Sequence, residues 1–261
     1  MQKEAYRLTG FTAVIAAVGF LLRWLQSLHL YEEETGLAVR GLGSSALLIA
    51  LMVAVCAVLT YWVCVRLRGR TTAPRSAEEA LGHRTVVYRV LGVAAAVLLV
   101  AAGVLQLREA EDYAFPVLRR LLAALLVLTG VGAGINTLTA SRENRRNLRC
   151  AAATVATVTA CFWLVVLYKE VSAEPVIWRY AVEVLALVSG AVALYYLAGY
   201  PFGDPRPYSC LLFCEAALFF NVMTVIDEHA ASESLAFAAA ALLFGCRGYA
   251  LACSLRKKDI E

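Results

Sequence analysis

The chain has 261 residues, of which 61% are hydrophobic and only 17% are charged, and its net charge is +4. Soluble domains usually carry about a quarter of charged residues, so this composition excludes an ordinary soluble globular protein. The basic residues lie in short connections without interleaved aromatic residues, and anionic lipid head groups explain them without nucleic acid. We therefore expect a lipid bilayer as the main partner and no nucleic acid.

Eight apolar segments follow one another along the chain, each close to the roughly 20 residues that cross the hydrocarbon core of a bilayer. Inside lipid a segment must satisfy its own backbone hydrogen bonds, so each is predicted to be a helix. The expected fold is all-α, with residues 1–261 forming a single integral membrane domain that is a polytopic transmembrane bundle. The predicted helices are residues 8–30, 44–65, 85–107, 118–140, 150–168, 180–199, 208–226 and 235–255.

The connections between these segments alternate in charge. Fifteen Lys and Arg residues fall in the two terminal segments and the even-numbered connections, against six in the odd-numbered ones, which are acidic instead. By the positive-inside rule, both termini and the even-numbered connections are cytoplasmic. The expected location is the cytoplasmic (plasma) membrane, with anionic lipid head groups at the arginine-rich inner connections.

The outer turns resemble one another in sequence. Both LQSLHLYEEETGLAVRGL (25–42) and VLQLREAEDYAFPVLRRLL (104–122) read as apolar helix, acidic turn and then Arg at the next helix. This favours four repeated helical hairpins threaded in the same sense, as in some transporters. The alternative is that any acidic turn between two membrane helices has this pattern.

Two opposite charges lie inside the last two predicted helices. Glu215 and Arg247 are at matching depths, and helices joined by a short loop are antiparallel neighbours. A charge in the bilayer centre is costly, so the sequence predicts that Glu215 and Arg247 form an ion pair. The pair could be a switch in an ion-coupled cycle, or it could simply hold the two helices in register.

A second set of charges is expected near the outer side. Arg23 in the first helix and Glu183 in the sixth lie within one or two turns of their outer ends, so they could pair or each could extend to water.

Small and polar residues follow one face of the seventh segment, including Asn221, and such a stripe should face protein rather than lipid. Asn136 is a second candidate inward-facing amide. It follows Gly130-x-x-x-Gly134, a spacing that lets a neighbouring backbone approach closely. These features predict that the seventh helix is the centre of the bundle.

No cofactor, metal site or catalytic residue is predicted. The eight cysteines form no C-x-x-C, and the three histidines have no metal-ligand spacing. The outer rim, where His29 and His229 lie near Glu32 to Glu34 and Asp227 to Glu228, could hold a divalent cation, although solvated carboxylates are the simpler reading. Sequence patterns of membrane proteases and nucleotide-binding loops are also missing.

The sequence therefore favours a multi-pass membrane protein that transports a small solute or ion by means of polar residues within the bundle. The alternative is a non-catalytic membrane subunit, sensor or scaffold that binds a partner protein, in a homo- or hetero-oligomer. An intramembrane enzyme ranks last, because no nucleophile–base pair is evident.

Overall fold

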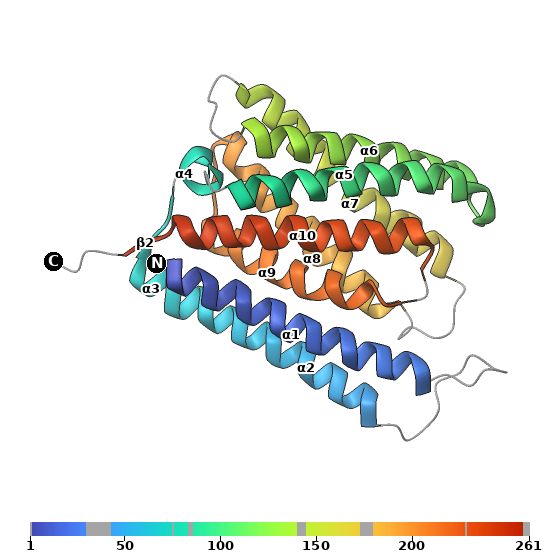
Figure 1. The fold of residues 1–261 in the computed structure, drawn as a ribbon, viewed down its shortest axis with the longest axis horizontal. Coiled ribbons are helices and arrows are strands. Elements are labelled where there is room, and N and C mark those ends of the chain that lie inside the picture. Colours follow the sequence, from blue (N-terminus) through green and yellow to red (C-terminus); the bar gives the residue numbers. More distant parts are fainter. Residues whose placement is uncertain are drawn as a thin grey trace.

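The structure is a computed structural model that describes residues 2–29, 43–74, 76–82, 86–139, 145–172, 180–227 and 229–257. It contains eight helices long and apolar enough to cross a membrane, which confirms the predicted all-α multi-pass bundle (Figure 1). Each predicted span matches one of these helices, and most extend a few residues beyond the apolar segment. In the described part of the chain, the strands are two short segments that pair with each other.

The helices are not arranged across the bundle in chain order, since the last helix, α10, lies between α1 and α5 (Figure 1). The second membrane span, Ala46–Arg70, is one continuous rod that combines α2, a π-helical segment and α3. The elements are α1 (Gln2–His29), α2 (Gly43–Thr60), η1 (Tyr61–Leu67), α3 (Arg68–Arg70), β1 (Thr71–Thr72), α4 (Ala77–Leu81), α5 (Val86–Glu109), η2 (Ala110–Asp112), α6 (Pro116–Thr139), α7 (Arg146–Val171), α8 (Ala181–Phe202), α9 (Pro207–Thr224), α10 (Ala231–Ser254) and β2 (Arg256–Lys257).

The last two helices, α9 and α10, are the most buried part of the bundle. Over an 18-residue stretch of each span, 67% of the residues of α10 and 61% of those of α9 are buried, against 28% for α1. The α10 helix packs against α5, α9 and α1, whereas α9 packs mainly against α8 and α10. In Figure 1, α1 and α2 lie beside each other and are tilted relative to α10. The predicted central position of the seventh span, α9, is therefore shared with α10.

Glycines allow α5 and α6 to approach most closely. A Cβ at Gly130 would lie 2.8 Å from the backbone nitrogen of Val100, and one at Gly103 would lie 2.8 Å from the carbonyl oxygen of Ala123. No side chain larger than hydrogen fits at either place, so the two backbones are in direct contact. Gly134, the second glycine of the predicted spacing, has room for a methyl group.

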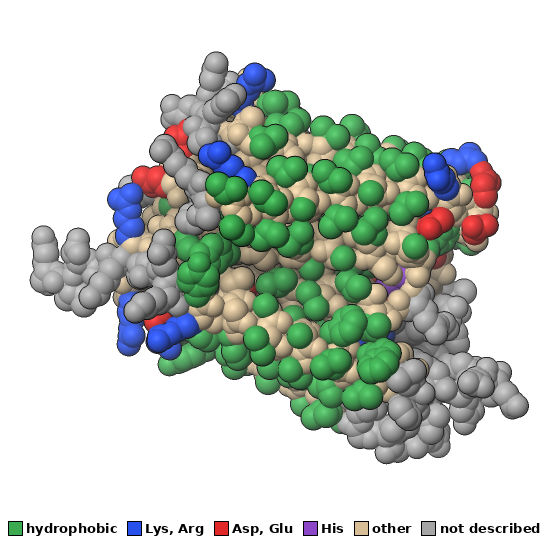
Figure 2. Space-filling view, in the orientation of Figure 1, with side chains coloured by type: hydrophobic (Ala, Val, Ile, Leu, Met, Phe, Trp, Pro, Cys, Tyr) green, Lys and Arg blue, Asp and Glu red, His purple; other side chains and the backbone are tan. Residues whose placement is uncertain are grey.

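Charged side chains gather at the two ends of the molecule, and hydrophobic ones cover the band between them (Figure 2). The start of α1 and the strand β2 lie at the same end, as an even number of spans requires (Figure 1). We call this the basal end, and the end that carries η2 and the start of α10 the acidic end. The side of the membrane that each end faces, and the duplication of hairpins, stay predictions.

Candidate functional site

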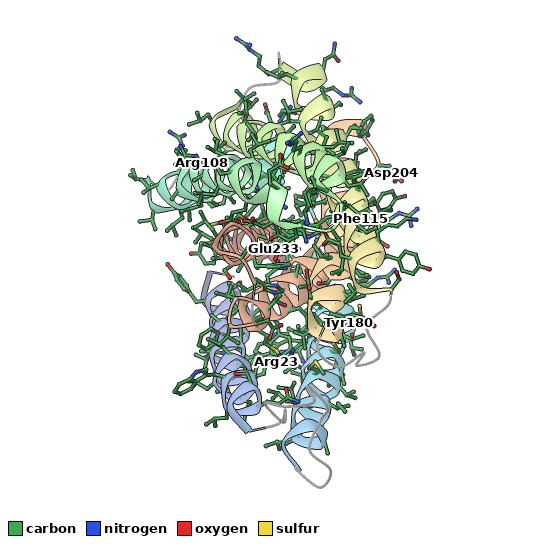
Figure 3. All side chains as sticks on the ribbon, turned by 90° about the vertical axis from the view of Figure 1, so that its right-hand side faces the viewer. Arg23, Arg108, Phe115, Tyr180, Asp204 and Glu233 are labelled. Atoms are coloured by element: carbon green, nitrogen blue, oxygen red, sulfur yellow. The ribbon has the colours of Figure 1, made fainter. Side chains whose placement is uncertain are left out.

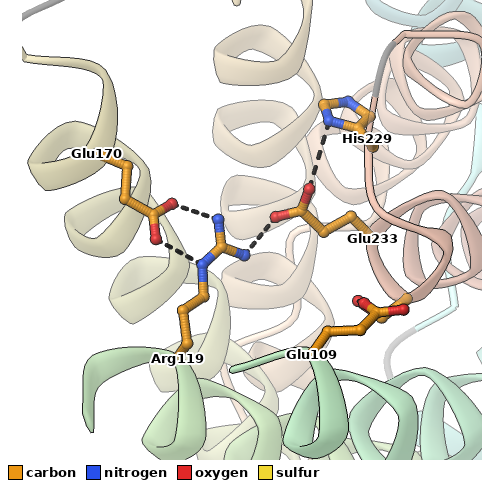
Figure 4. Close-up of polar contacts among 6 residues, drawn as sticks. Glu109, Arg119, Glu170, His229 and Glu233 are labelled. Atoms are coloured by element: carbon orange, nitrogen blue, oxygen red, sulfur yellow. Dashed lines mark hydrogen bonds and ion pairs between the residues drawn. The ribbon is translucent and has the colours of Figure 1, made fainter. Parts of the chain in front are cut away.

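Arg119 is the centre of a buried ion cluster at the acidic end. Its side chain is 4% exposed and lies on the first turn of α6. Nε donates to Glu170 Oε1 at 2.6 Å, Nη2 bonds the other Glu170 oxygen, and Nη1 bonds Glu233 Oε1 (Figure 4). The guanidinium also stacks over the ring of Tyr113, 3.9 Å from its centroid. One arginine thereby joins α6, α7 and α10.

His229 extends this cluster from the connection between α9 and α10. Its Nδ1 lies 3.5 Å from Glu233 Oε2 (Figure 4). Burial alone would lower the pKa of His229, but the hydrogen bond to Glu233 and the charges of Glu183 and Asp227 outweigh it, so the pKa is raised. The protonated imidazole is therefore favoured in the folded protein. We call Arg119, Glu170, His229 and Glu233 the end cluster.

Arg23 has a different partner from those predicted. Its Nε donates to Asp227 Oδ1 at 2.7 Å, and its Nη1 donates to Gln26 Oε1 at 3.0 Å. It is 4% exposed, so it does not extend to water as a free side chain. Glu183 is also buried, but it faces His229 rather than Arg23. Asp227 belongs to a loop, and its position above α1 could not be inferred from helix depth.

Seen end-on, these contacts occupy the inside of the bundle. Figure 3 views the acidic end, where Glu233 lies near the middle of the helices and Arg23 lies closer to α1 and α2. Next to the cluster, Ser232 donates to Glu109 Oε2, which joins α5 to α10. Acids and bases at this end therefore neutralise one another across several helices.

The structure does not form the predicted ion pair between Glu215 and Arg247. Glu215 is fully buried on α9, and its Oε1 accepts a hydrogen bond from Thr9 Oγ1 of α1 at 2.7 Å. Its second oxygen, Oε2, is buried and accepts no hydrogen bond from the described residues. Within the same part of the chain, no Lys or Arg lies within ion-pair distance of this carboxylate.

Arg247 faces the opposite way and also bonds neutral groups. Its Nη1 donates to Tyr88 Oη on α5 at 2.7 Å, and its Nη2 donates to Thr137 Oγ1 on α6 at 3.1 Å. The side chain is 5% exposed. Thus both intramembrane charges are buried, and both are held by uncharged hydroxyl groups.

The helical period explains why the pair is not formed. Depth was inferred correctly: a Cβ at Gly248 would lie 2.8 Å from Glu215 Oε1, so the carboxylate touches α10 one residue from Arg247. Successive helix residues point about 100° apart, so Arg247 turns away from Glu215 and toward α5 and α6. Matching depth fixes the height of two side chains but not their rotation about the helix axes.

Two hollows lie near these two charges. A cavity of about 70 Å³ is lined by Arg247, Asn136 and Arg149 together with small side chains of α6, α7 and α8. A larger and mostly apolar groove of about 720 Å³ lies between α1 and α5, with α9 and α10 at its base. Thr9 and Tyr88, the hydroxyl partners of Glu215 and Arg247, both line this groove.

The two predicted inward-facing amides lie in different places. Asn221 is 3% exposed and its Nδ2 donates to the Ala217 carbonyl of its own helix at 2.7 Å. Asn136 is half-buried and lines the small cavity beside Arg247. The residues that share the Asn221 face and are described are also buried, as the stripe predicted: Cys210, Cys214 and Thr224.

The sequence analysis missed Arg119 and Tyr88. Arg119 falls at the start of the predicted helix 118–140 and was counted among the basic residues of the preceding connection, so its burial on the first turn of α6 was not predicted. Among the described residues, no group of three or more His, Cys, Asp and Glu is arranged to hold a metal ion. Of the rim considered for a divalent cation, residues 32–34 and 228 lie outside the described residues, whereas Asp227 bonds Arg23 and His229 lies 3.5 Å from Glu233.

The fold and these contacts define a multi-pass α-helical membrane protein with opposite charges buried inside its bundle. Searches against models of known protein families, curated protein sequences and solved structures found no match for this chain.

Proposed function

We propose that the protein transports a small solute or ion across the membrane, and that Glu215 and Arg247 are the charged residues that bind the solute or a coupling ion. The observation that carries this proposal is that two opposite buried charges on adjacent helices face away from each other. Each is bonded to a neutral hydroxyl group instead.

The energetic argument starts from the cost of burial. A charged side chain near the bilayer centre costs about 2.5–3.5 kcal/mol on insertion scales. An ion pair that only held helices together would offset this cost, and the contact of Glu215 with Gly248 puts its carboxylate next to α10. Because Glu215 and Arg247 do not pair with each other, both can bind a ligand or a coupling ion. Ionisable groups inside membrane helices often line transport paths in this way.

The hollows supply a place for such a ligand. Arg247 opens onto the small cavity, and Glu215 lies behind Thr9, which lines the large groove. The proposal includes the orientation predicted from the basic connections, in which both termini are cytoplasmic, and it places the protein in the plasma membrane. It also includes contact of the basal arginines with anionic lipid head groups.

The test is flux in proteoliposomes that hold the purified protein and a pH-sensitive dye. The external solutes are inorganic phosphate, sulfate, acetate and a mixture of neutral amino acids. We expect flux of at least one solute in the wild type and its loss in Glu215→Gln and Arg247→Met. Glu111→Gln and Arg89→Met, which change exposed side chains, should retain it. Flux that is equal in wild type and Glu215→Gln, or the same as in empty vesicles, contradicts the proposal.

One observation favours a second candidate, a membrane subunit that binds a partner helix. The groove between α1 and α5 is apolar and large, and Tyr6, Leu91 and Leu242 are among the residues that line it. An apolar helix could lie there with its face against α10. In that case the protein would co-purify with a defined partner from native membranes, and no solute would move in vesicles.

A further inference from the structure

The small cavity lies toward the basal end, at the meeting point of five helices. Asn136 of α6, Arg149 of α7, Pro201 of α8 and Arg247 of α10 line it, and Ala77 of α4 contributes to one side. The α4 helix belongs to the connection that precedes α5, so the cavity is bounded there by an element outside the membrane spans.

The wall of this cavity is mostly apolar and carries two arginines. Arg149 and Arg247 are 7% and 5% exposed, and both side chains contribute to its wall. None of the described lining residues is acidic. Arg247 uses two of its nitrogens on the hydroxyl groups of Tyr88 and Thr137, which hold the guanidinium in place without neutralising its charge. Arg247 therefore brings a buried positive charge to the cavity wall, where an anion would stabilise it.

The volume and the lining residues of the cavity restrict the size and the chemical class of a ligand that could bind there. A water molecule needs about 10–15 Å³ of such volume, so a cavity of about 70 Å³ has room for roughly five groups of that size. Alanine side chains form much of the remaining wall: Ala133, Ala152, Ala153 and Ala156. Guanidinium groups bind planar or tetrahedral oxyanions through paired hydrogen bonds, and the Asn136 amide adds one more donor.

We propose that this cavity binds a small oxyanion, such as phosphate, sulfate or a short carboxylate, through Arg247, Arg149 and Asn136. The inference names the substrate class of the transporter proposed above and rests on that function. Binding and flux are separate measurements, however, so the two proposals can fail separately. Tyr88 acts as a positioning residue because it holds Arg247 from the side of the groove.

The test is calorimetric titration of inorganic phosphate and of sulfate into the purified full-length protein in neutral detergent. We expect saturable binding of at least one of them, weakened at least tenfold in Arg247→Met, because this variant loses the charged hydrogen bonds to the anion. Arg149→Met should weaken it similarly. Arg89→Met removes an exposed arginine from the start of α5 and should leave binding unchanged.

A second variant keeps the test informative if the arginine variants fold poorly. Ala153→Leu should fill part of the cavity, keeps both arginines, and should reduce phosphate binding by an order of magnitude. If wild type and Ala153→Leu bind equally, or if no variant differs from the wild type, the proposed site is wrong. Binding without flux in vesicles supports the site and rejects transport.

A phosphate group could reach the cavity from a lipid instead of from solution. The titration is therefore repeated with protein in nanodiscs of phosphatidylcholine and in nanodiscs that also contain phosphatidylglycerol. Competition by phosphatidylglycerol that disappears in Arg247→Met identifies a lipid head group as the source of the same oxyanion chemistry. If neither free phosphate, sulfate nor phosphatidylglycerol binds, the inference is overturned.

Discussion

The acidic end and the interior of the bundle treat their charges in opposite ways. At the acidic end, Arg119 bonds Glu170 and Glu233, and Arg23 bonds Asp227. In the interior, Glu215 and Arg247 lie on adjacent helices, and among the described residues each bonds hydroxyl groups only. The first arrangement holds helices together by ion pairs, whereas the second holds two buried charges by neutral groups. The comparison teaches that burial of a charged side chain in this bundle does not by itself imply an ion pair.

The largest effect is expected from Arg119→Ala. This change leaves the carboxylates of Glu170 and Glu233 in a buried site without their cation, which typically costs about 3–5 kcal/mol. The measurement is the unfolding free energy in mixed detergent micelles. Arg120→Ala is the matched control, because its side chain is 54% exposed and pairs with Glu111 at the surface. The control should lose less than about 1 kcal/mol. Equal losses in both variants would show that the end cluster has no structural role.

A smaller loss of stability is expected from Gly248→Ala, and it tests where the Glu215 carboxylate lies. Gly248→Ala brings a methyl group to 2.8 Å from Glu215 Oε1, and overpacking of this kind costs about 1–3 kcal/mol. Gly245→Ala is the control, since its nearest neighbour is a Leu218 methyl carbon at 3.4 Å. Both changes give the same gain in helix propensity, so their difference isolates the contact with the carboxylate. Two variants of equal stability would indicate that Glu215 points elsewhere, for instance toward Arg247.

The smallest effect is a pH dependence that belongs to the end cluster. The pKa of His229 is raised in the folded protein, so its stabilisation is complete below the ordinary value of about 6.5 and is lost as pH rises through the folded value. Glu233 of α10, Glu183 of α8 and Asp227 of its own connection face the imidazole. We expect the unfolding temperature of the wild type to fall relative to that of His229→Gln between about pH 5 and pH 9. Parallel curves for the two proteins would exclude this role.

The spans could be predicted from the sequence because length and composition determine them. A run of about 20 apolar residues has few alternatives to a membrane helix, and the alternation of basic connections fixed the number of spans. Gly130 was also identified correctly as a close contact, since a small residue at a helix interface has a direct steric meaning. These inferences depend on local sequence alone.

The partners of the charged residues could not be predicted, because they depend on how each helix is rotated and which helices are neighbours. Glu215 and Arg247 were placed at matching depth, but the rotation of α10 turns Arg247 toward Tyr88. Arg23 found its partner in a loop, at Asp227. One signal was available for the end cluster: acidic residues gather at the outer turns, and the few arginines among them had to lie near carboxylates.

The short strand pair at the basal end has a mechanical consequence. Thr71 and Thr72 pair with Lys257 and Arg256, so the segment after α10 is tied to the segment before α4. Because α10 carries Arg247 and α4 contributes Ala77 to the wall of the same cavity, this tie works like a strap between the two. An axial displacement of α10 would therefore also strain the connection that carries α4, so the guanidinium and one wall of its cavity are held to the same anchor.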